Sequence, residues 1–276
     1  MSVKIVTDST SDLPKELAQE LGITVVPLNV HFGLDTFRDG VDMQSDQFYH
    51  RLTTGPVLPK TSAPSPGLFK ECYDRLARDS QEIISIHISS KLSATYEAAL
   101  AAKQDMANCR VEVIDSKLVS MGLGVLAITA AKAARTGAKI DEVMKLIKDS
   151  IKEINIVVAL DTLEFLQKGG RVGRAQAWLG SMLSIKPLLS LEEGEVTPLE
   201  RVRTHAKSVD RMYQLLEERL PARELAIIYS TDPDEANKMV AHLRELFPQQ
   251  QVYVARFGPA LGTHTGPGSL GIVSLK

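Results

Sequence analysis

The chain has 276 residues, of which 44% are hydrophobic and 24% charged, so it can bury a large core and its length favours two domains. Its formal net charge of -2, with acids and bases interspersed, provides no basic field for nucleic acid or an anionic membrane. The start of the chain lacks a charged leader, and no apolar run reaches the ~18 residues of a membrane span, so we expect a cytoplasmic protein.

The first half of the sequence repeats a short strand, a polar turn and a helix. The apolar, β-rich runs are residues 3–6, 83–88 and 111–114, and each ends in acidic or hydroxyl residues that precede a helical pattern. Parallel strands with crossover helices give this order. We therefore predict an α/β fold with an N-terminal parallel-sheet domain over residues 1–153, closed by a helix at residues 140–151.

The segment between the first two repeats is less regular. Residues 23–32 are predicted to form one strand, and residues 33–59 an irregular polar stretch with a helix near residues 45–53. Residues 61–67, with two prolines and a glycine, predict a loop before a helix at residues 68–77.

The pattern changes after residue 153, where we place the domain boundary. A strand, a glycine-basic turn and a helix are followed by a hairpin with a turn at Gly194, and then by strands mixed with helices. This order predicts a C-terminal α+β domain over residues 154–276 with a mixed, partly antiparallel sheet. Its predicted strands are residues 154–160, 187–191, 196–203, 225–230, 252–257 and 270–275, and its helices are 175–183, 204–220 and 233–247.

Hydroxyl side chains gather where one buried strand ends. In open α/β sheets, ligands bind beyond the carboxyl ends of the strands, and helix N-termini there favour anions. Neutral hydroxyls can hold a carboxylate or phosphate without titrating, although each could instead be a helix cap or turn former. The candidates for a small anion site are Ser89, Ser90, Ser93, Thr95, Thr61 and Ser62.

A second set of candidates carries imidazole or guanidinium groups. His264 lies in a glycine-rich loop where packing would not demand a histidine, and we weigh a binding role equally with a structural turn. Arg203 ends a predicted strand and could meet an anion or form a salt bridge. Arg171 and Arg174, on the glycine-basic turn, could meet a phosphate or a partner, or could be ordinary surface charges.

Several common site types are missing from the sequence. No Gly-x-Ser-x-Gly elbow announces a serine nucleophile, and the glycine-basic turn lacks dinucleotide spacing and a Walker lysine. Asp8, Asp12 and Asp115 show no metal-ligand spacing. Cys72 and Cys109 are too few for a disulfide framework or a tetrahedral metal site. We therefore expect neither a metal nor a cofactor.

Six segments, taken together and in order, resemble the DegV family, whose members include FakB, the fatty-acid-binding subunit of bacterial fatty acid kinase. The segments are residues 7–14 (TDSTSDLP), 61–67 (TSAPSPG), 89–96 (SSKLSATY), 115–117 (DSK), 163–173 (LEFLQKGGRVG) and 262–268 (GTHTGPG). Lys91 and Ala94 replace glycines common in the family, and Ala63 replaces a frequent glutamine, which affects the expected head-group geometry more than the fold.

The resemblance implies that one long-chain fatty acid lies in an internal tunnel, with its carboxylate between the two domains. By this resemblance Thr61 and Ser93 bind the carboxylate, Arg203 and His264 lie near the head group, and Arg171 faces the kinase. The predicted ligand-binding set is Thr61, Ser62, Ser93, Arg203, Thr263 and His264. Because uncharged hydroxyls leave the acid incompletely neutralised, we also expect the carboxylate to stay nucleophilic.

The resemblance further implies partners. A FakA-like fatty acid kinase subunit would phosphorylate the bound acid with its own ATP, and an acyltransferase would use the acyl phosphate for phospholipid synthesis. The chain itself, expected to be a monomer, would then be a carrier and not an enzyme. Two other hypotheses stay open at this point: a serine esterase or hydrolase using Ser93 and His264, and a nucleotide or phosphosugar binder.

Overall fold

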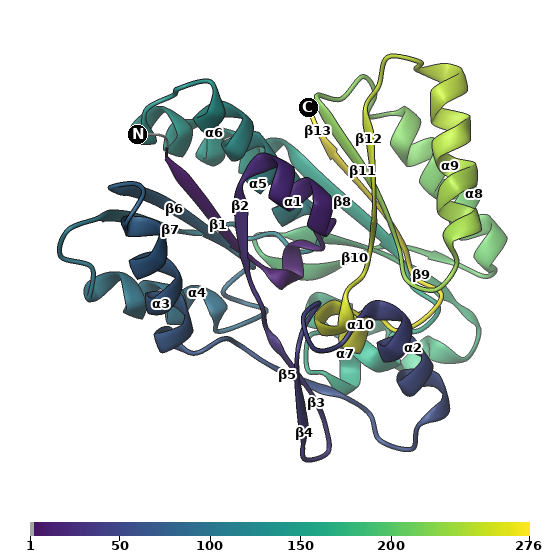
Figure 1. Ribbon diagram of the computed structural model, residues 1–276. Coiled ribbons are helices and arrows are strands. Elements are labelled where there is room, and N and C mark those ends of the chain that lie inside the picture. Colours follow the sequence, from purple (N-terminus) through teal and green to yellow (C-terminus); the bar gives the residue numbers. More distant parts are fainter. Residues whose placement is uncertain (1–2) are drawn as a thin grey trace.

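The computed structural model describes residues 3–276, without the side chains of residues 180–184, and it contains three β-sheets. In Figure 1 the two larger sheets lie side by side with helices between and outside them, and the small sheet projects below. The chain therefore has the α/β architecture that the sequence predicts, with one parallel and one mixed sheet.

The N-terminal sheet has four parallel strands in the order β2-β1-β6-β7. Helices α3 and α4 pack on one face, and α1, α5 and α6 lie on the other (Figure 1). The strands are β1 (Lys4–Asp8), β2 (Ile23–Val26), β6 (Glu82–His87) and β7 (Arg110–Asp115). The helices are η1 (Ser9–Ser11), α1 (Lys15–Leu21), α3 (Pro66–Ala77), α4 (Thr95–Gln104), α5 (Met121–Arg135) and α6 (Ile140–Glu153).

A three-stranded antiparallel sheet interrupts this domain and corrects one prediction. Residues 23–32 do not form a single strand, because the ladder of β2 stops before Pro27, which has no N–H to donate. The chain then enters the small sheet, with order β4-β3-β5. Its elements are β3 (Asn29–Phe32), β4 (Asp35–Arg38), α2 (Ser45–Thr54) and β5 (Lys60–Ser62), and Thr61 is therefore held in a strand and not in a loop.

The C-terminal sheet has six strands in the order β10-β9-β8-β13-β11-β12, of which only β11 and β12 pair in parallel. Helices α8 and α9 cover its outer face (Figure 1). The strands are β8 (Ile154–Ala159), β9 (Lys186–Glu192), β10 (Glu195–Val202), β11 (Glu224–Tyr229), β12 (Val252–Arg256) and β13 (Leu270–Leu275). The helices are α7 (Glu164–Lys168), η2 (Gly173–Ser184), α8 (His205–Glu217), α9 (Pro233–Leu246) and α10 (Pro259–Thr265).

Two local predictions in this half are wrong. Residues 175–183 lie in a 3-10 helix, η2, and do not form an α-helix. The glycine-rich stretch before β13 contains the seven-residue helix α10, which starts at Pro259 and stops at Gly266, where φ is +73°. Proline at the first helical position and glycine after the last are typical helix boundaries, and they could have indicated α10 in the sequence.

Helix α5 joins the two large sheets. It packs on β1 in one sheet and on β11 and β13 in the other, and one core cluster includes Leu126, Ile86 and Val273 from these three regions. The small residues of α5 permit this close approach: a Cβ at Gly122 would lie 2.3 Å from Ile156 Cδ1. Because this core crosses residue 153, the domain boundary stays a prediction.

Candidate ligand-binding site

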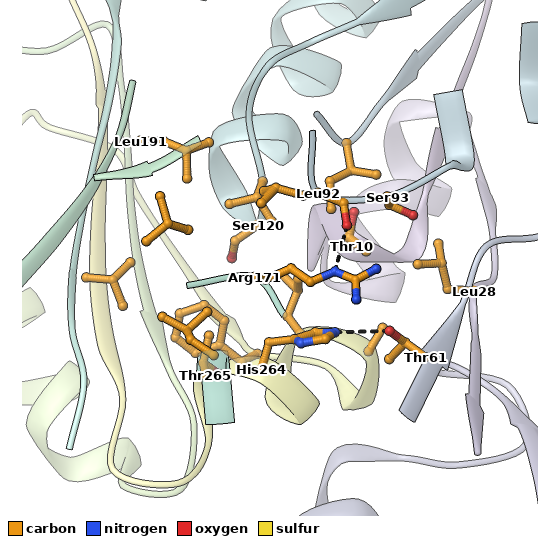
Figure 2. A pocket seen from close by; sticks show the side chains of 18 of the residues that line it. Thr10, Leu28, Thr61, Leu92, Ser93, Ser120, Arg171, Leu191, His264 and Thr265 are labelled. Atoms are coloured by element: carbon orange, nitrogen blue, oxygen red, sulfur yellow. Dashed lines mark hydrogen bonds between the residues drawn. The ribbon is translucent and has the colours of Figure 1, made fainter. Parts of the chain in front are cut away.

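An internal cavity lies between the two sheets, beyond the carboxyl ends of β1, β6 and β7. Its empty volume is about 1060 Å³, including the part that opens to solvent. Most of the wall is aliphatic, with side chains from β8, β9 and β10, including Ile156, Val158, Leu189 and Val196, and from Leu160 just after β8. Polar groups gather at one end, which Figure 2 shows from close by. The cavity is therefore apolar with one polar end.

Thr61 and His264 form the centre of the polar end. The Thr61 hydroxyl on β5 and the His264 Nε2 on α10 are 3.0 Å apart, although 203 positions separate them in the chain (Figure 2). Burial, and to a lesser extent the nearby Arg171 guanidinium, lower the pKa of His264 from 6.5 to about 4. The imidazole is therefore neutral at physiological pH.

The neutral imidazole also sets the direction of this hydrogen bond. Its Nδ1 is buried without a hydrogen-bond partner among the described residues, close to Gly169, where an added Cβ would lie 2.1 Å away. A buried N–H without a partner would be costly, so we assign the proton to Nε2 from the hydrogen-bond network. His264 then donates to Thr61, and the Thr61 hydroxyl proton is free to point into the cavity.

The hydroxyls after β6 divide into two groups. Ser93 lines the cavity, and its Oγ is 2.8 Å from the Thr95 hydroxyl. Ser89 and Ser90 hold the fold instead, because Ser89 Oγ donates to the Gly194 carbonyl and Ser90 Oγ to the Asp115 carboxylate. Of the serines gathered here, Ser93 is thus the one that reaches the cavity.

Arg171 lies in a place that the sequence did not predict. It lines the cavity, and in Figure 2 its guanidinium points into the space between Ser93, Leu28 and Thr61. Nε donates to the Leu92 carbonyl over 3.0 Å and Nη1 to the Gly169 carbonyl over 2.6 Å. The polar end therefore contains a guanidinium beside its hydroxyls, and this guanidinium belongs to Arg171 and not to Arg203.

Of three other predicted residues, Ser62 lines the cavity and the other two do not. The Ser62 hydroxyl lies 2.9 Å from His31 Nε2, and the Thr263 hydroxyl donates to the Pro259 carbonyl within α10. Arg203 is exposed after β10 and is not among the residues that line the cavity. The sequence analysis missed Thr10 and Ser120, both of which line it; Thr10 belongs to a hydroxyl-rich turn that could have indicated this role.

Buried carboxyl groups accept hydrogen bonds from the residues that line the polar end. Asp8 accepts hydrogen bonds from the Thr10 amide and hydroxyl, the Ile88 amide and His87 Nδ1, so both of its carboxyl oxygens have partners. Asp12 accepts from the Ser120 hydroxyl and the Gly258 amide, and burial raises its pKa well above 3.8.

Asp39 is the third buried carboxyl. Burial raises its pKa from 3.8 to about 7, and hydrogen bonds from Ser9 and the Ala260 amide offset this only in part. It lies close to Asp12, since a Cβ added at Gly258 would be 3.2 Å from a carboxyl oxygen of each. The start of α10 therefore rests on two carboxyls that resist ionisation.

The geometry does not support a hydrolase. His264 is hydrogen-bonded to Thr61 and not to Ser93, so no base adjoins the Ser93 hydroxyl. Ser85, His87 and Asp8 do form a hydrogen-bonded chain, but all three are fully buried and none lines the cavity. A nucleophile needs access to its substrate, so this chain of residues is structural.

Within residues 3–276 as described, no group of three or more His, Cys, Asp or Glu side chains is placed to hold a metal ion. No helix in the same part of the chain is long and apolar enough to cross a bilayer.

Comparisons with known proteins find relatives that match this chain over nearly its full length. Residues 2–276 match the model of the DegV family. Protein DegV of Bacillus subtilis is 35% identical, over 99% of this chain and 98% of its own length, and a DegV domain-containing protein of Streptomyces coelicolor is 37% identical, over 98% and 97%. The crystal structure of DegV from B. subtilis, described as a fatty acid binding protein, has a TM-score of 0.93 at 34% identity and full coverage of both chains. The solved structure of a DegV family protein from Thermus thermophilus, which is described as binding fatty acid, has a TM-score of 0.92 at 31% identity, again with full coverage of both chains.

Proposed function

This chain belongs to the DegV family, and from that premise we propose that its cavity encloses one long-chain fatty acid, with the carboxylate at the polar end. The observation that supports the proposal is a mostly aliphatic wall with the Thr61 and Ser93 hydroxyls and the Arg171 guanidinium gathered at one end. An amphipathic ligand with one anionic group and a long alkyl tail fits this arrangement. The similar structures from B. subtilis and T. thermophilus, described as binding fatty acids, support it.

The energetics of such a ligand are dominated by its tail. Burying about 15 methylenes at ~0.8 kcal/mol each gives roughly 12 kcal/mol, against association costs of at least ~4 kcal/mol. The head group then mainly fixes the orientation. The Thr61 and Ser93 hydroxyls would donate to the carboxylate, and the Arg171 guanidinium would supply the opposite charge.

The first test removes the two protein hydroxyls that would donate to the carboxylate, those of Thr61 and Ser93. We expect Thr61→Val and Ser93→Ala each to lower the affinity for hexadecanoic acid roughly ten- to a hundredfold, because a hydrogen bond to a charged group contributes roughly 1.5–3 kcal/mol. Mass spectrometry of lipid extracted from the purified protein should find one intact fatty acid per wild-type chain. Thr54→Val, at the exposed end of α2, is the matched control. Unchanged affinity in both site variants would move the carboxylate elsewhere.

The proposal includes a finer step, in which the bound acid is presented to a FakA-like, ATP-dependent kinase that returns an acyl phosphate for phospholipid synthesis. The chain would then act as the carrier subunit, with no ATP site of its own. Arg171 suits this step because it lies at the polar end, where the reacting oxygen of the acid would be. Its guanidinium could contact the transferred phosphoryl group as well as the carboxylate.

The second test separates binding from phosphorylation. Arg171→Ala should keep most of the bound lipid, since the tail provides most of the affinity, but should lower acyl phosphate formation with the kinase at least tenfold. Arg174→Ala is the control, because Arg174 lies on the same turn but pairs with Glu192 and Glu195. Lipid content and kinase turnover would be measured on the same preparations. Equal turnover in the two variants would remove Arg171 from the reaction.

A further inference from the structure

The tip of the β9–β10 hairpin extends beyond the sheet that holds its base. β10 pairs with β9 as far as Glu195 and Glu192, but β8 pairs with β9 only through Leu188, Leu189 and Ser190. β10 is the edge strand, and its other side contacts the start of η2 and no strand of the described residues. Residues 191–196, here called the strap, therefore have no neighbouring strand beyond their own hairpin.

The strap is also part of the cavity wall. Leu191 and Val196 line the cavity, and Figure 2 shows Leu191 facing it from across the aliphatic side. On the opposite side the wall is made by Leu92 and Val119, from the loops after β6 and β7. Movement of the strap away from these loops would open the apolar part of the cavity to solvent.

Polar contacts at its tip fasten the strap to those loops. Ser89 Oγ donates to the Gly194 carbonyl over 2.7 Å, and Lys117 Nζ lies 2.8 Å from the Glu193 carboxylate. The ion pair is exposed, with side-chain exposures of 51% and 73%, so solvent screens it. A second, longer pair joins Lys91 Nζ to the Glu195 carboxylate over 3.9 Å and is also exposed to solvent. This latch thus consists of one buried neutral hydrogen bond and two weak ion pairs, without aliphatic packing at Glu193 or Gly194.

The tip of the hairpin packs closely against Ser89. Gly194 has a φ of +81°, and a Cβ placed there would lie 2.4 Å from Ser89 Oγ. Only glycine meets both conditions without displacement. The hairpin tip therefore packs closely against Ser89, although only a few polar contacts hold it there.

A bend point lies at the base of the strap. The register between β10 and β9 shifts between Pro198 and Glu200, which leaves Leu199 as the extra residue of a bulge, 46% exposed. Bulges locally interrupt the ladder and bend the strand. Arg174 pairs with Glu192 and Glu195, so the start of η2 belongs to the same half of the molecule and can move with the strap.

We propose that the strap is the door of the cavity, which opens when the latch at Ser89 and Lys117 releases and the hairpin bends at its bulge. The cavity opens to solvent in part, and movement of the strap would extend this opening along the aliphatic wall, where the alkyl tail would lie. This inference rests on the proposed function, because it takes the ligand to be a fatty acid. The latch then controls how fast the acid exchanges, and not which acid binds.

A reversible crosslink tests this directly. A Cβ at Gly194 would lie 3.4 Å from the Ser89 Cβ, close to the ~3.5–4.5 Å of a disulfide, so Ser89→Cys with Gly194→Cys should crosslink the latch. We expect the oxidised double variant to exchange bound hexadecanoic acid for its perdeuterated form at least tenfold more slowly than the same protein after reduction. Each single-cysteine variant under the same oxidant is the control; Cys72 and Cys109 are buried.

Ser89→Ala gives a second measurement without a crosslink, and it should raise the exchange rate severalfold. Equal rates in the crosslinked and reduced protein would overturn the strap as the door while leaving fatty acid binding intact. Because the positive φ of Gly194 strains any other residue there, Ser89→Ala also stands as a test without the crosslink, and a Ser89→Ala exchange rate equal to that of the wild type overturns the inference. If no variant, including the wild type, takes up the acid, the proposed function fails and the strap loses its role.

Discussion

Replacing Val158 with tryptophan should lower the affinity for a long-chain fatty acid about a hundredfold while leaving the fold intact. Val158 lies on β8, and its side chain forms part of the aliphatic wall. An indole at this position would occupy space that the tail needs, displacing about four methylenes at ~0.8 kcal/mol each, or roughly 3 kcal/mol. Titration with hexadecanoic acid after delipidation, together with mass spectrometry of the purified protein, would measure the loss.

The control must separate a filled cavity from a damaged sheet. Val254→Trp places the same side chain on β12, where the valine is 37% exposed, and we expect normal binding there. Val196→Phe fills the cavity from another strand, so it should weaken binding with less risk to the central sheet. Full affinity in a folded Val158→Trp protein would show that the alkyl tail lies elsewhere.

Replacing Asp39 with asparagine should stabilise the protein at neutral and alkaline pH. The carboxyl has a pKa of about 7 in the folded chain against 3.8 when unfolded, so the folded state binds more protons between these values. Stability from this group is therefore full below about pH 4 and falls as the pH rises through this window, by up to about 4 kcal/mol. Asparagine mimics the protonated acid and does not titrate. The gain should be near zero at pH 4 and largest above pH 7.

Urea denaturation between pH 4 and pH 8 would measure this difference. His264 acts in the opposite direction, because its pKa is lowered to about 4 and the unfolded chain binds the proton first, so the wild-type profile alone would hide both effects. Asp42→Asn is the control: Asp42 is exposed and paired with Arg38, which lowers its pKa to about 2, so no gain is expected. A constant difference between Asp39→Asn and wild type at every pH would contradict the assignment.

The parallel sheet was predictable because its signals are local. Each apolar run, such as residues 83–88, precedes a polar turn and a helix, and the structure confirms a parallel sheet built from these runs. The break after β2 was missed, although Pro27 marks it, because the apolar character continues through it. Helix α10 was missed because its glycines concealed two ordinary boundaries.

The site was harder to predict because its parts meet only through long-range packing. The sequence singled out Thr61, Ser93 and His264 as residues of unusual chemistry, and all three line one cavity. It could not show that Arg171 turns inward, since this depends on the backbone carbonyls of Leu92 and Gly169. Arg203 and Arg171 are alike as residue types, and only the folded chain separates the exposed one from the one inside.

The pairing of β5 with α10 also has a consequence for the newly made protein. Thr61 leaves the ribosome long before His264, and the imidazole that orients its hydroxyl belongs to the last two dozen residues of the chain. β13, which follows α10, pairs with both β8 and β11 and so completes the larger sheet. A growing chain can thus form its first sheet early, yet the polar end of the cavity is complete only after both β5 and α10 have been synthesised.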